Sequence, residues 1–171
     1  MSKLEDLAKE LATKKHEGQN RTFTKEPYVE HPKRVAEIVR EFKSSHKIAK
    51  LLSASYLHDT IEDTDTTEEE LKKLFGGLVS SLVKELSSDD AEIKRLGKGE
   101  YLSQKMIGMS SWALVIKLAD RLDNVSDLDK TSDKFRARYT KETLLILDSL
   151  EKNRKLSGTQ KKLVDKIRGC L

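Results

Sequence analysis

The sequence of 171 residues contains one cysteine, Cys170, close to its C-terminal end. A disulfide within the chain and a zinc site built from several thiolates are therefore excluded. Such low cysteine usage is typical of a reducing compartment, so the sequence predicts a cytoplasmic protein. We expect Cys170 itself to be an end residue without a catalytic role, because no histidine lies near it in the sequence.

Long apolar runs are also absent. No stretch approaches the roughly 20 apolar residues that a transmembrane helix needs, so we expect no contact with a membrane. The N-terminal stretch MSKLEDLAKELATKK carries acidic residues, unlike a signal or transit peptide. Glycine-rich phosphate loops of the Walker type are missing too, which argues against a kinase or NTPase of that design.

The sequence has no block of like charge. Its 33 Lys and Arg residues are interleaved with 29 Asp and Glu residues, which leaves a net charge of +4. A nucleic-acid interface is therefore not expected. The small positive excess instead suits a small polyanionic ligand, such as a nucleotide that bears several phosphates.

Helical patterns fill the chain, without an alternating strand pattern, a repeat or a linker. Apolar residues recur at spacings of three and four, and both prolines, Pro27 and Pro32, fall in one early segment. We predict a loop over 19–30, a polar surface excursion over 87–99, and an all-α fold that forms a single helical domain over residues 1–171. The first predicted helix contains the repeat from Leu4 to Leu11 and ends near Gly18, and a later one is capped by 65–70 and stops at Gly76-Gly77. The others cover about 31–42, 46–61, 78–86, 100–108, 111–129 and 133–153, with a last one after Gly158.

Residues that can perform chemistry gather in the segment from Tyr56 to Thr64. On a helix, its side chains His58, Asp59, Glu62 and Asp63 point within an arc of about 140°. A His-Asp pair followed one turn later by a Glu-Asp pair is the arrangement that a metal ion and a base need. The same pattern fits a solvated helix end, so this segment alone leaves both interpretations open.

Two further residues favour a metal site. His31 begins a predicted helix, and Asp120 lies on a later one, with Asn124 one turn away, Lys117 close by, and a core stripe on the opposite side. Two imidazoles and two carboxylates suit Mn, Fe, Co or Zn better than Ca. The candidate ligand set is His31, His58, Asp59 and Asp120.

Several motifs together resemble the hydrolase domain of the RelA/SpoT family of alarmone enzymes, within the HD superfamily of metal-dependent phosphohydrolases. These motifs are PYVEHPKRVA (27–36), LHDTIEDT (57–64), the helix end at Phe75-Gly76, IKLADRLDN (116–124) and RYTKET (138–143). Long family members carry synthetase and regulatory domains that do not fit in 171 residues. The chain therefore resembles the small, stand-alone alarmone hydrolases.

The resemblance implies an HD-domain helical fold and hydrolysis of guanosine 3′,5′-bis(diphosphate), or its pentaphosphate relative, with release of the 3′-pyrophosphate. It implies that one divalent ion, usually Mn²⁺, is held by His31, His58, Asp59 and Asp120. It further implies that Glu62 and Asp63 position and activate the attacking water. Which of the two is the base stays open, because close carboxylates titrate as a pair.

The resemblance also implies a nucleotide pocket. Arg21 would pack on the guanine base, Tyr28 lies in the pocket-forming segment, and Asn124 would lie near the ribose and phosphates. Thr22 stands where the family usually has Lys, in a loop that is one residue longer and lacks Gly; Lys25 would return that charge. Asp123 replaces the usual His, and 82–89 (LVKELSSD) lacks the usual Thr-Lys ending.

The segments expected to recognise the substrate thus differ from the family pattern, whereas every residue expected to bind the metal ion or activate the water is present. Two alternatives remain open. One is an HD hydrolase of another nucleotide or of a phosphorylated cofactor, and the other is a nucleotide-binding protein without turnover. The oligomeric state, including a homo-oligomer, is also open.

Overall fold

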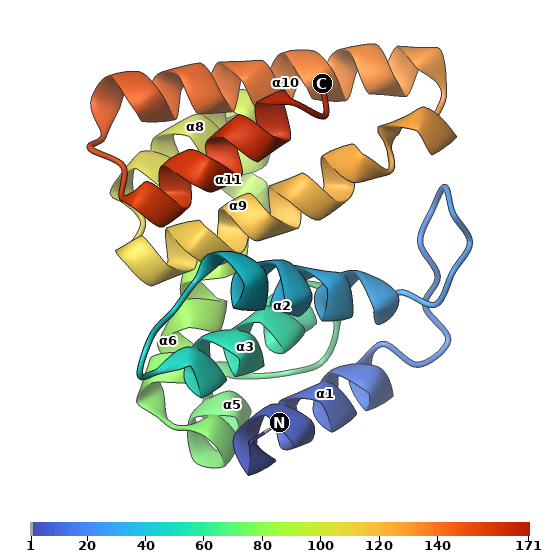
Figure 1. Ribbon diagram of the computed structural model, residues 1–171. Helices are drawn as coiled ribbons and strands as arrows, with labels where there is room; N and C mark the ends of the chain where they lie inside the picture. Colours follow the sequence, from blue (N-terminus) through green and yellow to red (C-terminus); the bar gives the residue numbers. More distant parts are fainter. Residues whose placement is uncertain (1) are drawn as a thin grey trace. The chain divides into compact units, whose positions relative to one another are not determined.

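The computed structural model describes residues 2–171, which form helices joined by loops with no named β-strand among them. The prediction of an all-α fold is confirmed. Contacts divide these residues into an N-terminal unit, up to Ser87, and a C-terminal unit, from Ser88 to Leu171; each is described by itself (Figure 1). The single domain over residues 1–171 stays a prediction. Within residues 2–171, no helix is both long enough and apolar enough to cross a membrane.

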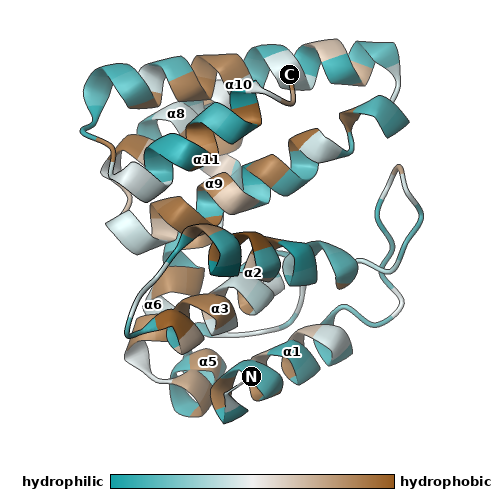
Figure 2. Cartoon of the chain, in the orientation of Figure 1, coloured by the Kyte–Doolittle hydropathy of each residue, from teal (hydrophilic) through white to brown (hydrophobic). Residues whose placement is uncertain are grey.

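The N-terminal unit is built around its third helix, α3. The elements of this unit are α1 (Lys3–Lys15), α2 (Glu30–Phe42), α3 (Ile48–Leu57), α4 (Thr60–Asp63), α5 (Glu68–Phe75) and α6 (Gly77–Leu86). Helix α3 packs against α1, α2 and α6, and its residues from Leu51 to Leu57 are all buried. Figure 2 shows apolar colour along α3 and α6, whereas α1 and α2 carry hydrophilic stretches. Burial of apolar surface against α3 therefore holds this unit together.

Local signals set the helix ends of this unit. The Thr67 hydroxyl accepts a hydrogen bond from the Glu70 backbone N–H at 3.1 Å, which caps α5. Gly76, at φ 81°, separates α5 from α6, because glycine adopts this left-handed conformation without a steric cost. The sequence predicted both the acidic start and the glycine end of α5.

The predicted continuous helix over 46–61 is wrong. Helix α3 ends at Leu57, and a short helix, α4, begins at Thr60. At the break, the His58 ring donates through Nδ1 to the Ser55 carbonyl at 2.8 Å, and the Thr60 hydroxyl donates to the Leu57 carbonyl at 2.8 Å. These side chains use carbonyls that backbone N–H groups would take in an uninterrupted helix.

The C-terminal unit contains α7 (Asp90–Leu96), α8 (Lys98–Gly108), α9 (Ser111–Ser126), a 3₁₀ turn η1 (Leu128–Lys130), α10 (Asp133–Asn153) and α11 (Gly158–Arg168). Helix α10 packs on α8, and α11 packs on α9. Helix α10 has its predicted bounds, and the Ser132 hydroxyl caps its start. The predicted helix over 111–129 ends earlier, at Ser126, and continues as η1.

The segment 87–99, predicted as a polar surface excursion, contains no buried residue, but a helix that was not predicted, α7, occupies most of it. The Asp89 carboxylate accepts hydrogen bonds from the Ala91 and Glu92 backbone N–H groups at 2.9 and 3.2 Å. Arg95 pairs with Glu92 one turn later, at 2.6 Å. None of the α7 residues is buried, so local capping and this ion pair, rather than an apolar stripe, mark the helix.

The Arg154 side chain forms hydrogen bonds with the C-terminal end of α8. Its Nη1 atom donates hydrogen bonds to the main-chain carbonyls of Met106, Ile107 and Met109. We expect Arg154→Ala to lower the free energy of unfolding by about 1–3 kcal/mol, because half-buried carbonyls lose their donor. Urea unfolding measures this, with the exposed Lys152→Ala as the control. Equal stability of the two variants would contradict the assigned role.

Candidate metal centre and active site

Two buried histidines of the N-terminal unit form the centre of the candidate site. His31 lies in the first turn of α2, and His58 directly follows α3. Each is 1% exposed. Their ring centroids lie 5.2 Å apart at an angle of 69°, and one ring nitrogen of each lies within 4.8 Å of the other. The fold thus brings together two histidines that are 27 positions apart in the sequence.

The His58 tautomer is fixed by its environment. The Ser55 carbonyl can only accept, so His58 Nδ1 donates to it at 2.8 Å, and Nε2 of the neutral ring carries the lone pair. That Nε2 lies 3.0 Å from Asp59 Oδ2, and His31 Nε2 lies 3.7 Å from the same oxygen. Lone pairs and a carboxylate that converge in this way repel one another unless a cation lies between them, so the donor set fits a divalent metal ion.

Tyr28 orients Asp59. The Tyr28 hydroxyl donates a hydrogen bond to Asp59 Oδ2 at 2.6 Å. The Tyr28 ring also meets the edge of the His31 ring, with centroids 5.9 Å apart. A carboxylate held from outside by a hydroxyl is typical of the support that metal ligands receive. Tyr28 therefore touches the candidate centre, rather than only lining the nucleotide pocket as the sequence predicted.

Glu62 and Asp63 lie on α4, directly after His58 and Asp59. Both residues are exposed to solvent. Partial burial raises the pKa of the Asp63 carboxyl, and the negative charges of Asp59 and Glu62 raise this pKa further, against a hydrogen bond from Tyr28 that lowers it. A carboxylate with a raised pKa is a better proton acceptor near neutral pH than an ordinary one. The pair is thus chemically suited to accept a proton from water.

Arg21 and Lys25 lie between the end of α1 at Lys15 and the start of α2 at Glu30; Figure 1 shows this segment as a long loop. The Arg21 backbone N–H donates to the Glu26 carbonyl at 2.9 Å, and Asn20 forms an isolated bridge with Pro27. Lys25 adopts φ 61°, the left-handed conformation that favours glycine. Its exposed side chain extends from a tight turn. The contacts of Arg21 and Lys25 with a nucleotide stay predictions.

In the C-terminal unit, Asp120 is 8% exposed on α9. Lys117 Nζ lies 2.9 Å from its Oδ2 atom, and Asn124 Nδ2 donates to its Oδ1 atom at 2.6 Å. The predicted proximity of Asp120 to Asn124 and Lys117 is thus observed. The sequence predicted one buried apolar stripe on α9. Burial extends beyond that stripe, however, since Asp123 is only 4% exposed.

Arg121 is a buried cation that the sequence analysis did not single out. Its Nη1 atom lies 3.0 Å from Glu142 Oε1 and donates to the Thr143 hydroxyl at 3.3 Å. Its guanidinium carbon lies 4.6 Å from the Tyr139 ring centroid, and burial raises the pKa of Tyr139 to about 12. The sequence held one signal for this cluster. Tyr139, Glu142 and Thr143 belong to the RYTKET motif, and Arg121 belongs to the IKLADRLDN motif.

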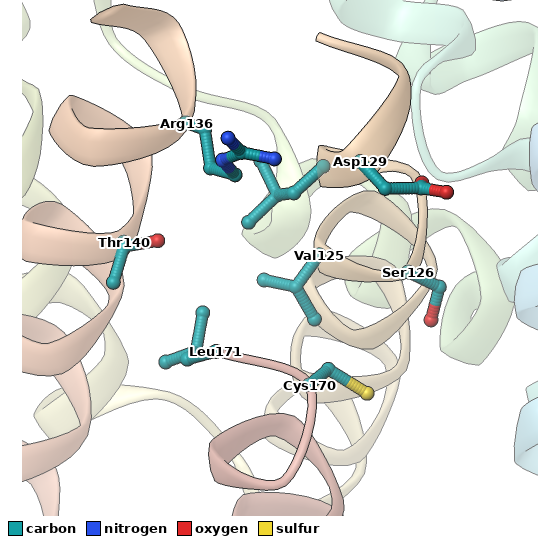
Figure 3. Close-up of a pocket in the computed structure, with 8 residues that line it drawn as sticks. Val125, Ser126, Asp129, Arg136, Thr140, Cys170 and Leu171 are labelled. Atoms are coloured by element: carbon teal, nitrogen blue, oxygen red, sulfur yellow. The ribbon is translucent and has the colours of Figure 1, made fainter. Parts of the chain in front are cut away.

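A hollow of about 440 Å³ opens among the end of α9, η1, α10 and the C-terminal residues (Figure 3). Its lining includes Arg136, Thr140 and Cys170, but none of the residues that the sequence predicted for the site. Cys170 is exposed. Among residues 2–171, no other group of three or more His, Cys, Asp or Glu side chains is arranged so that it could hold a metal ion, and His46 is exposed.

Comparison with known proteins identifies the family. A family model described as "HD domain" matches residues 8–156. The Aquifex aeolicus protein named guanosine-3′,5′-bis(diphosphate) 3′-pyrophosphohydrolase is 36% identical over 148 residues, which cover 81% of this chain and 20% of that protein. The human protein of the same name, MESH1, is 37% identical over 124 residues, or 72% of this chain and 68% of that protein.

A solved structure described as "A metazoan ortholog of SpoT hydrolyzes ppGpp and plays a role in starvation responses" superposes with a TM-score of 0.80 at 31% identity. The superposition covers 100% of this chain and 98% of the chain in that structure. The chain spans about a fifth of the length of the bacterial relatives that it matches. It therefore belongs to the HD-domain family and, within it, to the RelA/SpoT-type group that includes the guanosine-3′,5′-bis(diphosphate) 3′-pyrophosphohydrolases.

Proposed function

We propose that this protein is a metal-dependent hydrolase that removes pyrophosphate from the 3′ position of guanosine 3′,5′-bis(diphosphate) or its pentaphosphate relative. One observation carries the proposal. The lone pair of His58 Nε2 lies 3.0 Å from the Asp59 carboxylate, which in turn is held by the Tyr28 hydroxyl. This is a cation-binding arrangement, and the acids Glu62 and Asp63 follow it on α4. The names of the bacterial and human relatives supply the substrate.

We propose His31, His58, Asp59 and Asp120 as the ligands of one ion, with Mn²⁺ as the ion in use. Two imidazole nitrogens and two carboxylate oxygens match its preferences. When bound, such an ion would polarise a phosphoryl oxygen and lower the pKa of water. Lys117 and Asn124 contact the two oxygens of Asp120, so they fix the direction in which this carboxylate points.

The other proposed steps belong to side chains of α4 and its surroundings. Glu62 or Asp63 accepts the proton of the attacking water, and the raised pKa of Asp63 favours that acceptance near neutral pH. The water oxygen bonds to the phosphorus next to the 3′ oxygen. The bond between this phosphorus and the 3′ oxygen breaks, the 3′ oxygen takes up a proton, and pyrophosphate leaves.

The nucleotide would be recognised by Arg21 at the base, Tyr28 in the pocket wall and Asn124 near the ribose and phosphates. Lys25 would add the positive charge that Thr22 does not supply. A cytoplasmic location fits the use of a soluble nucleotide and the single cysteine. Asp123 and Thr22 favour one alternative, an HD hydrolase with a different phosphorylated substrate.

The test is a substrate panel. Purified protein with Mn²⁺ is incubated with guanosine 3′,5′-bis(diphosphate), other nucleotides and phosphorylated cofactors, and pyrophosphate and phosphate are measured separately. We expect pyrophosphate from the alarmone, with Asp59→Asn inactive and the exposed Asp129→Asn as active as wild type. Phosphate release from another nucleotide, with the alarmone untouched, would favour the alternative substrate. No turnover of any compound would contradict the enzyme assignment.

A further inference from the structure

His16 lies outside the set of residues assigned above to metal, water or nucleotide. It follows α1 directly and is 2% exposed. Its Nδ1 atom donates to Gln19 Oε1 at 2.8 Å, because an amide oxygen can only accept. Gln19 Nε2 then donates to the main-chain carbonyl of Asp63 at 3.1 Å. Two consecutive hydrogen bonds therefore join the end of α1 to the end of α4.

The second ring nitrogen of His16 indicates why an imidazole is present. Nε2 is buried and forms no hydrogen bond with any residue that the structure describes, 2 through 171. A buried acceptor without a hydrogen bond costs about 1–3 kcal/mol. An apolar ring would fill the same space without this cost, so packing alone does not account for histidine here. The donor at Nδ1 is what an apolar ring lacks.

The same two residues also support Tyr28. The His16 and Tyr28 rings lie 4.8 Å apart, tilted by 34°, and the Tyr28 backbone N–H donates to the Gln19 carbonyl at 2.9 Å. The hydroxyl of Tyr28 reaches Asp59 at 2.6 Å. His16 and Gln19 thus hold the loop side of the site at two points, the Asp63 main chain and the Tyr28 ring.

We infer that His16 is a positioning residue for the water-activating acids. Through the hydrogen bonds of Gln19 it fixes the main chain of Asp63, and hence the direction of the Glu62 and Asp63 carboxylates. The inference rests on the proposed function of these two acids. It assigns His16 no contact with substrate, so the step that it affects is turnover rather than binding.

A matched pair of variants separates the donor from the ring. His16→Phe keeps an aromatic ring against Tyr28 but has no donor, whereas His16→Asn keeps a donor close to the position of Nδ1. We expect His16→Phe to lower kcat for alarmone hydrolysis about 10-fold, with KM within about twofold of wild type and unchanged Mn²⁺ content, because a small misplacement of a catalytic group slows chemistry strongly. His16→Asn should recover kcat to within about threefold of wild type.

Gln19→Met provides a second route to the same break and should reproduce the kcat of His16→Phe. If His16→Phe shows no thermal unfolding transition and therefore does not fold, Gln19→Met alone tests the role of the hydrogen bonds. Wild-type kcat in Gln19→Met, or a loss of kcat in His16→Asn at least as large as in His16→Phe, would overturn the inference.

Hydrogen exchange provides a readout that needs no substrate. Peptides covering residues 60–66 should exchange faster in His16→Phe and Gln19→Met than in wild type and His16→Asn, because the tether to the Asp63 carbonyl is lost. If wild type does not hydrolyse the alarmone, the proposed function fails, yet this exchange pattern still decides whether His16 holds α4. Equal exchange in all four proteins would overturn the inference.

Discussion

Replacing His58 with alanine is expected to abolish tight Mn²⁺ binding and to lower kcat/KM for alarmone hydrolysis by at least about 10³-fold. His58 is 1% exposed, and the Ser55 carbonyl fixes its tautomer through Nδ1. Alanine has no ring nitrogen, so this substitution removes one of the proposed metal ligands. Metal content after dialysis, measured by mass spectrometry, and calorimetric titration with Mn²⁺ check the result.

The chain offers its own control. His46 is exposed, so His46→Ala should keep wild-type metal content and activity, although it removes the same kind of side chain. His31→Ala should behave like His58→Ala, because His31 Nε2 lies 3.7 Å from the same Asp59 oxygen. Full metal content in either variant, with a wild-type circular dichroism spectrum, would contradict the assigned ligand set.

The sequence predicted the helices that local signals delimit. Helix α10 has its predicted bounds because a serine caps its start and apolar residues recur at helical spacing in its second half, where Ile146, Leu147 and Leu150 are buried. The break after Leu57 was missed, because its cause is competition by His58 and Thr60 side chains for main-chain carbonyls, and helical periodicity does not register that competition. Helix α7 was missed for the opposite reason, since capping forms it without a buried stripe.

The candidate site could be predicted as a set of residues but not as an arrangement. The order of His31, His58-Asp59 and Asp120 in the sequence identified the residue types and the family. Contacts made across loops were not accessible from spacing. These include the Tyr28 hydroxyl on Asp59 and the bond from Gln19 to the Asp63 carbonyl, which depend on how the 16–29 loop folds back.

Replacing Asp63 with asparagine is expected to separate activity from stability. Asparagine cannot accept the proton of the attacking water as a base, so kcat should fall by about 10²- to 10⁴-fold. Glu62→Gln, measured beside it, identifies the base, because the substitution of the base gives the larger loss. The exposed Glu69→Gln on α5 controls for the removal of one negative charge from this unit. A kcat near wild type in both Asp63→Asn and Glu62→Gln would contradict the assigned role of the pair.

Asp63→Asn should make the protein more stable, although it lowers its activity. Burial, Asp59 and Glu62 raise the pKa of the Asp63 carboxyl, so the folded state disfavours its charged form relative to the unfolded state. The ionised carboxylate therefore destabilises the fold above this raised pKa, and the penalty disappears below the unfolded pKa of about 4. We expect Asp63→Asn to raise the Tm of the metal-free protein by about 1–2 °C at pH 7 and to leave it unchanged near pH 3.

Asp65, two positions away, provides the comparison of opposite sign. A hydrogen bond from Lys15 lowers the pKa of the Asp65 carboxyl, and Lys15 Nζ lies 2.8 Å from Asp65 Oδ1. Asp65→Asn should therefore not raise the Tm at pH 7, because its carboxylate is favoured rather than disfavoured in the folded state. If the two metal-free variants showed the same change in Tm, burial and charge repulsion at Asp63 would not be the cause of the stabilisation. The expected contrast indicates that Asp63 is held where its charge serves catalysis at the expense of the fold.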